Sequence, residues 1–173
     1  MPIIQKHGGT IDKFMGDDIM ATFGTAVRTN SHAADARAAI RELADASEGM
    51  AAKRIDEGKQ GLDVGFAVAV GPGVFGMFGD RTRLAVTVIG DAVNLAAKLE
   101  KHTRDEGVRG LTTASCITIA SEQGYKSSYT LELRQQRHVA GVNGPLDLVV
   151  LAACRKDVAF SRHTSQDGKV VYL

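Results

Sequence analysis

Hydrophobic residues along the chain occur in short runs whose spacing predicts an alternation of strands and helices. Residues 10–23 hold two apolar-rich runs on either side of Gly16-Asp17-Asp18, and this arrangement predicts a β-hairpin with a tight turn. In residues 32–50, apolar side chains recur at three- and four-residue spacing, which predicts a helix with one buried face. Residues 62–70 are almost continuously apolar, as in a strand that is covered on both faces.

The second half of the chain continues this pattern. It predicts strands at 74–78, 84–89, 110–112, 128–139 and 146–153, a helix from Asp91, and a helix at 114–122. Because Asp91 ends a Gly-Asp turn before an apolar face, we expect its carboxylate to cap the helix. The order of elements predicts an α+β fold, a mixed β-sheet sandwich with helices packed on the sheet. Residues 154–173 are polar and predict a tail, of which 170–173 dock on a sheet edge.

Composition and charge narrow the possible functions. Of the 173 residues, 44% are hydrophobic and 24% are charged, which is normal for a single soluble domain. The formal net charge of +1 argues against a nucleic-acid partner, and no apolar run approaches the roughly 20 residues of a membrane span. Cys116 and Cys154 lie far apart in apolar surroundings and predict reduced core thiols, which favours the cytoplasm.

Two segments place polar groups where a ligand can approach. At the hairpin tip, the Asp17 carboxylate beside a glycine can bind a hard cation, although aspartates are also common turn formers. Asn94 and Lys98 are four residues apart and therefore share one helix face. Taken singly, these residues and Lys13 are more often solvated surface groups, and Thr87 is by default a good strand former.

Together, these segments resemble the catalytic domain of class III adenylate and guanylate cyclases. The matching motifs are HGGTIDKFMGD at 7–17, MATFG at 20–24, GPGVFG at 71–76 and TVIGDAVNLAAKLE at 87–100. The resemblance makes 1–153 the cyclase domain, with a ferredoxin-like core that pairs head to tail with a second copy. It implies conversion of a nucleoside triphosphate to a 3′,5′-cyclic monophosphate and pyrophosphate, assisted by Mg²⁺ or Mn²⁺.

The resemblance also implies roles for five residues. Asp17 corresponds to the second of two metal-binding aspartates, Lys13 and Thr87 to the purine-reading positions, and Asn94 to the residue that orients the ribose. Lys98 stands where the family has an arginine that stabilises charge on the α-phosphate. Lysine with threonine favours adenine, so we expect ATP rather than GTP. In the family, opposite subunits supply the metal and purine sites of one pocket, so we expect a homodimer in which Lys13 and Asp17 serve different pockets.

Three departures from the family pattern bear on activity. The resemblance begins after the family's first strand, which carries the first metal-binding aspartate, so we expect an incomplete metal site here. We also expect a fused regulatory domain in the full-length protein. Lys98 lacks the planar fork of arginine, and Ala140-Gly141 stands where the family usually has Lys-Gly.

Two alternatives to an active adenylate cyclase are therefore considered. One is a degenerate cyclase-homology domain used for dimerisation or nucleotide sensing. The other is a diguanylate cyclase, which ranks last because residues 15–19 do not match Gly-Gly-Asp-Glu-Phe and because that family does not predict the helix bearing Asn94.

Overall fold

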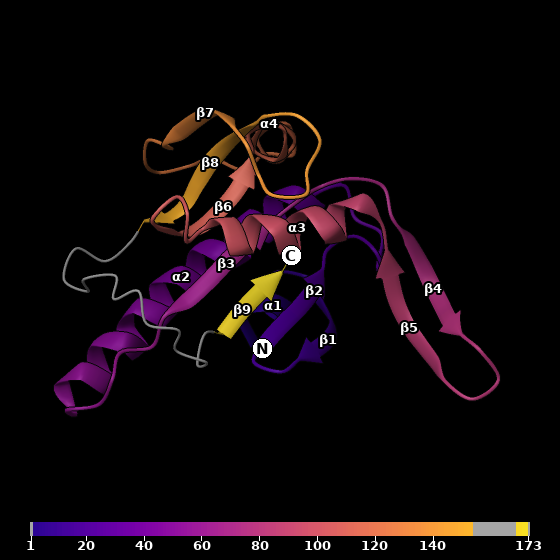
Figure 1. Ribbon diagram of the computed structural model, residues 1–173, viewed down its shortest axis with the longest axis horizontal. Coiled ribbons are helices and arrows are strands. Elements are labelled where there is room, and N and C mark those ends of the chain that lie inside the picture. The colour runs from indigo at the N-terminus through magenta and orange to yellow at the C-terminus, as the bar shows by residue number, and fades with distance from the viewer. Residues whose placement is uncertain (1, 154–168, 173) are drawn as a thin grey trace.

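The computed structural model describes residues 2–153 and, by their backbone, residues 169–172 (Figure 1). The helices are α1 (Pro2–Lys6), α2 (His32–Asp56), α3 (Asp91–His102) and α4 (Ala114–Glu122). The strands are β1 (Thr10–Met15), β2 (Asp18–Thr22), β3 (Val64–Val68), β4 (Val74–Gly79), β5 (Leu84–Ile89), β6 (Val108–Thr113), β7 (Leu133–Arg137), β8 (Leu146–Ala153) and β9 (Lys169–Tyr172). Residues 154–168 of the predicted tail lie outside the described part of the chain.

Seven of these strands form one mixed sheet in the order β1-β2-β9-β3-β6-β8-β7. The predicted hairpin is confirmed, since β1 and β2 pair antiparallel, while β3 and β6 run parallel to each other. Strand β9 runs parallel to both β2 and β3. The prediction that the last residues dock on an edge was therefore wrong, because β9 lies inside the sheet. There it pairs with backbone groups on both sides, and buried backbone groups require such partners.

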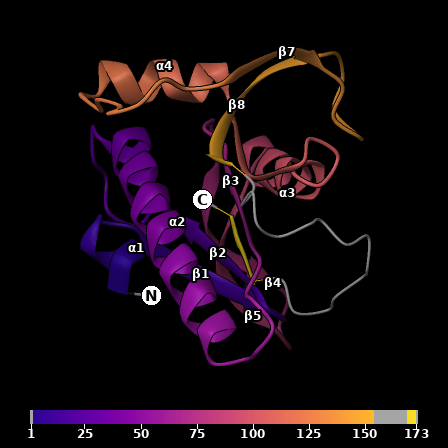
Figure 2. The ribbon, with the colours of Figure 1, turned by 90° about the vertical axis from the view of Figure 1, so that its left-hand side faces the viewer.

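Helices cover both faces of this sheet, so the predicted α+β sandwich is confirmed. Successive side chains of strand β3 point alternately to the two helical layers. Phe66 and Val68 pack in a cluster with Ile40 of α2, while Ala67 packs on the opposite face with Leu99 of α3. Figure 2 shows α2 and α3 on opposite sides of β3. Residues of α1 and α4 join the cluster on the α2 side. Within the described part of the chain, no helix is both long and apolar enough to cross a membrane.

Strands β4 and β5 form a separate two-stranded sheet that projects from the rest of the molecule (Figure 1). We call this hairpin the β4–β5 arm. At its tip, the Asp80 carboxylate accepts hydrogen bonds from the backbone amides of Thr82 and Arg83. Large apolar side chains along the arm are exposed, namely Val74, Phe75, Met77, Leu84, Val86 and Ile89. Of the residues in the two strands of the arm, only Thr87 and Val88 are buried.

Helix α3 begins differently from the prediction. Gly90 is the N-cap residue and Asp91 is already the first helical residue, so the expected aspartate cap was wrong. A Cβ at Gly90 would lie 2.7 Å from the carbonyl oxygen of Pro72, and this close approach restricts the cap position to glycine. The prediction for Cys116 is confirmed, because this thiol is free and buried. Cys154 lies outside the described residues.

Candidate functional site

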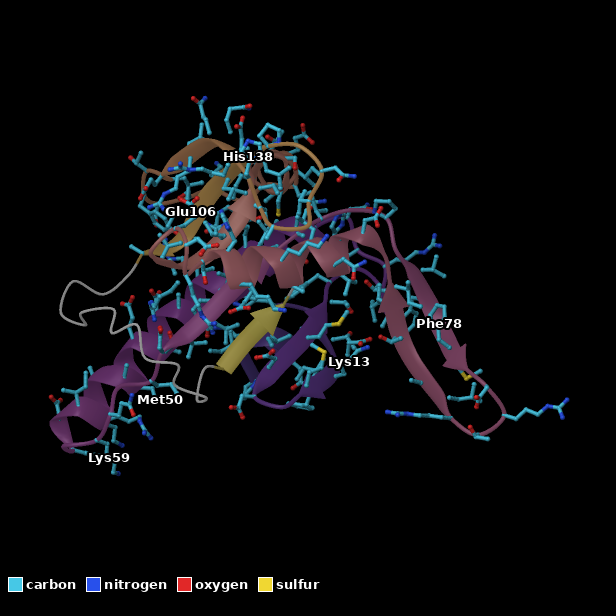
Figure 3. The ribbon with its side chains drawn as sticks, in the orientation of Figure 1. Lys13, Met50, Lys59, Phe78, Glu106 and His138 are labelled. Carbon is cyan, nitrogen blue, oxygen red and sulfur yellow. The ribbon has the colours of Figure 1, made fainter. Side chains whose placement is uncertain are left out.

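The β1–β2 hairpin brings Asp12 and Lys13 to the same side of the sheet edge. The register of β1 against β2 shifts between Ile11 and Lys13, so Asp12 is the extra residue of a β-bulge. A bulge re-aims side chains that strict alternation would send to opposite faces. The Lys13 Nζ atom lies 3.5 Å from Asp12 Oδ2, and the Asp12 side chain is only 4% exposed. Lys13 lies on the side of the hairpin that faces the β4–β5 arm (Figure 3).

Thr87 reaches the same carboxylate from the base of the arm. Its hydroxyl donates a hydrogen bond of 2.7 Å to Asp12 Oδ2, across 75 residues of sequence. The Thr87 residue is 8% exposed, so this bond is sheltered from water. The two predicted purine-reading positions therefore meet at one carboxylate oxygen. Sequence reasoning missed Asp12, because the only local sign of its role is its place next to Lys13.

Helix α3 carries the other two predicted residues of this region. Asn94 is exposed in the first turn, and Lys98 follows one turn later on the same face. The Lys98 ammonium donates a hydrogen bond to the backbone carbonyl of Gly141. Gly141 has a φ of +75°, a conformation that favours glycine, in the connection between β7 and β8. Lys98 and the turn at Ala140-Gly141, which both depart from the family pattern, thus contact each other.

The predicted metal ligand stands apart, in the turn between β1 and β2. Gly16 has a φ of +65°, which glycine adopts freely, and Asp17 beside it is exposed. Among the described residues, no group of three or more His, Cys, Asp or Glu side chains could hold a metal ion. Proteins usually hold Mg²⁺ with one or two carboxylates together with substrate phosphates. Asp17 fits the role of one such carboxylate.

Comparison with known proteins identifies the family. An adenylate cyclase of Anabaena cylindrica is 37% identical over 117 residues, which cover 66% of this chain and 22% of that protein. The solved adenylyl cyclase of P. aeruginosa is 26% identical with a TM-score of 0.57, over 91% of this chain and 78% of that chain. The chain belongs to the class III nucleotide cyclase domain family.

Other relatives of this cyclase domain are more distant or uncharacterised. An uncharacterised protein of Mycobacterium tuberculosis is 33% identical over 119 residues, 69% of this chain and 21% of that protein. A solved guanylyl cyclase has a TM-score of 0.66 at 23% identity, over 92% of this chain and 77% of that chain, which supports the fold. No protein-family model matches the chain. The chain spans about a fifth of the length of the curated relatives that it matches.

One hollow of the described residues lies beside this polar cluster and does not include it. It has a volume of about 510 Å³ and is lined mainly by residues 20–25, residues 68–73 and the first turns of α2 and α3. Lys13, Asp17, Thr87, Asn94 and Lys98 are absent from its lining. The five predicted residues therefore lie outside this hollow, and Asp17 and Asn94 are exposed, so a substrate held there needs further walls to exclude water.

Proposed function

We propose that this domain converts ATP to 3′,5′-cyclic AMP and pyrophosphate, in intracellular signalling. The ribose 3′-oxygen forms a bond to the α-phosphorus, the bond from phosphorus to pyrophosphate breaks, and the 3′-hydroxyl proton leaves to solvent. The observation that carries the proposal is the meeting of Lys13 and Thr87 at one buried carboxylate, on a chain of this family. An ammonium donor and a hydroxyl at fixed positions suit the edge of a purine ring.

The remaining residues take roles around the ribose and the phosphates. Asn94 is exposed on α3 and can hydrogen-bond the ribose, and Lys98 can donate to the α-phosphate as charge develops there. Asp17 is the residue that would hold Mg²⁺ or Mn²⁺, which supplies charge neutralisation at the phosphates when bound. A single exposed carboxylate binds such an ion weakly by itself, so we propose that the nucleotide's phosphates and the second subunit complete its coordination.

We further propose that the active form is a homodimer. The β4–β5 arm exposes six large apolar side chains, and exposed apolar patches of this kind commonly mark interfaces. The predicted residues lie outside the hollow, and Asp17 and Asn94 among them are exposed. A second copy packed on the arm both buries these side chains and supplies the missing wall. Since the relatives are several times longer, we propose that the domain is fused to a regulatory domain and lies in the cytoplasm, where ATP is available.

A direct assay tests the proposed activity. The protein is incubated with ATP and Mn²⁺ or Mg²⁺, and cyclic AMP is measured beside an Asp17→Ala control. We expect product from the wild-type protein and strong loss in the control, because Asp17 is the carboxylate assigned to the metal. Equal product from both proteins, or none from either, contradicts the proposed catalytic function.

A degenerate domain that senses nucleotide is the second candidate. It is favoured by the bond from the Lys98 ammonium to the Gly141 carbonyl, which engages the cation assigned to the phosphate. This candidate predicts that a fluorescent ATP analogue binds the protein and that no cyclic AMP forms. Binding and product formation measured on one preparation therefore separate the two functions.

A further inference from the structure

The hydroxyl of Thr87 has a defined direction because of its partner. A hydroxyl carries one proton and two lone pairs, whereas a carboxylate only accepts. Thr87 Oγ1 lies 2.7 Å from Asp12 Oδ2, so its proton is directed to Asp12 and its lone pairs point away. The Asp12 side chain is 4% exposed, which leaves little water to compete for the bond. Toward a ligand, Thr87 is therefore an acceptor only.

Lys13 supplies the complementary group beside it. Its ammonium has three donors and no acceptor, and it lies 3.5 Å from the same Asp12 Oδ2 atom. The bulge at Asp12 places both partners around this oxygen. The cluster consequently offers a ligand one acceptor, from Thr87, next to one donor, from Lys13.

We propose that Asp12 is a positioning residue that sets the choice of adenine over guanine by fixing the proton of Thr87. The inference rests on the proposed purine pocket and assigns its selectivity. Adenine presents a donor, its 6-amino group, next to an acceptor, N1, which matches the cluster. Guanine presents the acceptor O6 next to the donor N1–H, so each group would face one of its own kind.

Threonine without this partner discriminates poorly. A free hydroxyl rotates, and it can accept from the adenine amino group or donate to guanine O6. Selectivity then depends on Lys13 alone. With its proton held by Asp12, the Thr87 hydroxyl cannot donate to guanine O6. Guanine would then leave hydrogen-bonding groups unpaired, which weakens its binding relative to that of adenine.

The test compares the affinities of fluorescent ATP and GTP analogues for the full chain and its variants. In Asp12→Asn, the amide can donate to the Thr87 oxygen and release the hydroxyl proton. We expect the ratio of ATP to GTP affinity to fall about tenfold, the factor for one hydrogen bond. Asp63→Asn removes one exposed carboxylate elsewhere and is expected to keep the wild-type ratio.

Variants of Thr87 test the same idea without changing the buried aspartate, in case Asp12→Asn does not fold. Thr87→Ser keeps a hydroxyl that can donate to Asp12 and should retain the preference for ATP, whereas Thr87→Val should lose it. If Asp12 acts through Thr87, adding Asp12→Asn to Thr87→Val causes no further loss. A ratio unchanged by Asp12→Asn or by Thr87→Val overturns the assignment of Asp12. If the wild-type protein binds neither nucleotide, the proposed function itself fails and the assignment falls with it.

Discussion

The substitution Met77→Asp tests whether the β4–β5 arm joins two copies of the domain. Met77 is 72% exposed, more than the other apolar residues of the arm. Full burial of such a side chain contributes about 1.5–3 kcal/mol. In a two-fold symmetric dimer one substitution acts twice. Burial of the exposed 72% in both copies therefore contributes about 2–4 kcal/mol, which corresponds to a factor of about 30 to 1,000 in the dissociation constant.

Sedimentation velocity over a wide range of concentrations measures this dissociation constant directly. Met50→Asp is the matched control, because Met50 is also an exposed methionine, 53% accessible, on α2 far from the arm (Figure 3). We expect the dimer to weaken at least thirtyfold in Met77→Asp and to remain unchanged in Met50→Asp. The reasoning is refuted if both variants have the wild-type dissociation constant, or if the two weaken the dimer equally.

Three further predictions concern the rate and the stability of the domain. Lys98→Arg should raise the rate of cyclic AMP formation by up to about 10²-fold. A guanidinium can bond a phosphate with two N–H groups, and loss of one donor to the transition state typically lowers the rate about 10²- to 10³-fold. An unchanged or lower initial rate argues against this role of Lys98. Leu99→Ala should lower the free energy of unfolding by about 2–5 kcal/mol in urea titrations, because Leu99 is fully buried between α3 and the sheet. Burial alone would raise the pKa of Glu106, but the hydrogen bond from Arg134 and the nearby cations outweigh it and hold the pKa below its ordinary value. The stabilisation by the ionised Glu106 carboxylate is therefore present above about pH 4.5 and is lost as the pH falls further. Glu106→Gln should lower the melting temperature at neutral pH, and the melting temperatures of the variant and the wild type should converge in acid.

Features set by neighbouring residues could be predicted from the sequence. The hairpin around Gly16, the strand at 84–89, the helix at 114–122 and the strand at 146–153 all appear where turn residues and apolar runs indicated them. Each depends on local signals, such as a glycine with positive φ between two apolar runs. Helix α2 continues to Asp56, past its predicted end. The charged residues of its last turn are exposed, so the apolar pattern used for the prediction did not include them.

Features that depend on distant residues could not be predicted in this way. The position of β9 is decided by pairing with β2 and β3 across most of the chain, and a short apolar run at the end gives no sign of its partner. The bulge at Asp12 shifts the register by one residue, and periodicity alone assigns Asp12 to the face opposite Lys13. The contact between Asp12 and Thr87 follows from that shift, so the sequence identified two of the three groups in the cluster.

The contact between Lys98 and Gly141 looks at first like evidence for a degenerate domain, because it occupies the cation assigned to the phosphate. The energies argue otherwise. The carbonyl of Gly141 is neutral, and a solvent-exposed bond from an ammonium to a neutral carbonyl contributes little beyond what water offers. A triphosphate carries full negative charges, so Coulomb attraction to the ammonium adds to the hydrogen bond, whereas the neutral carbonyl has no opposite charge to offer. A bound nucleotide can therefore take the ammonium from the carbonyl. The contact then holds Lys98 near the connection between β7 and β8 until substrate arrives, which is compatible with catalysis at a rate reduced by the loss of the arginine fork.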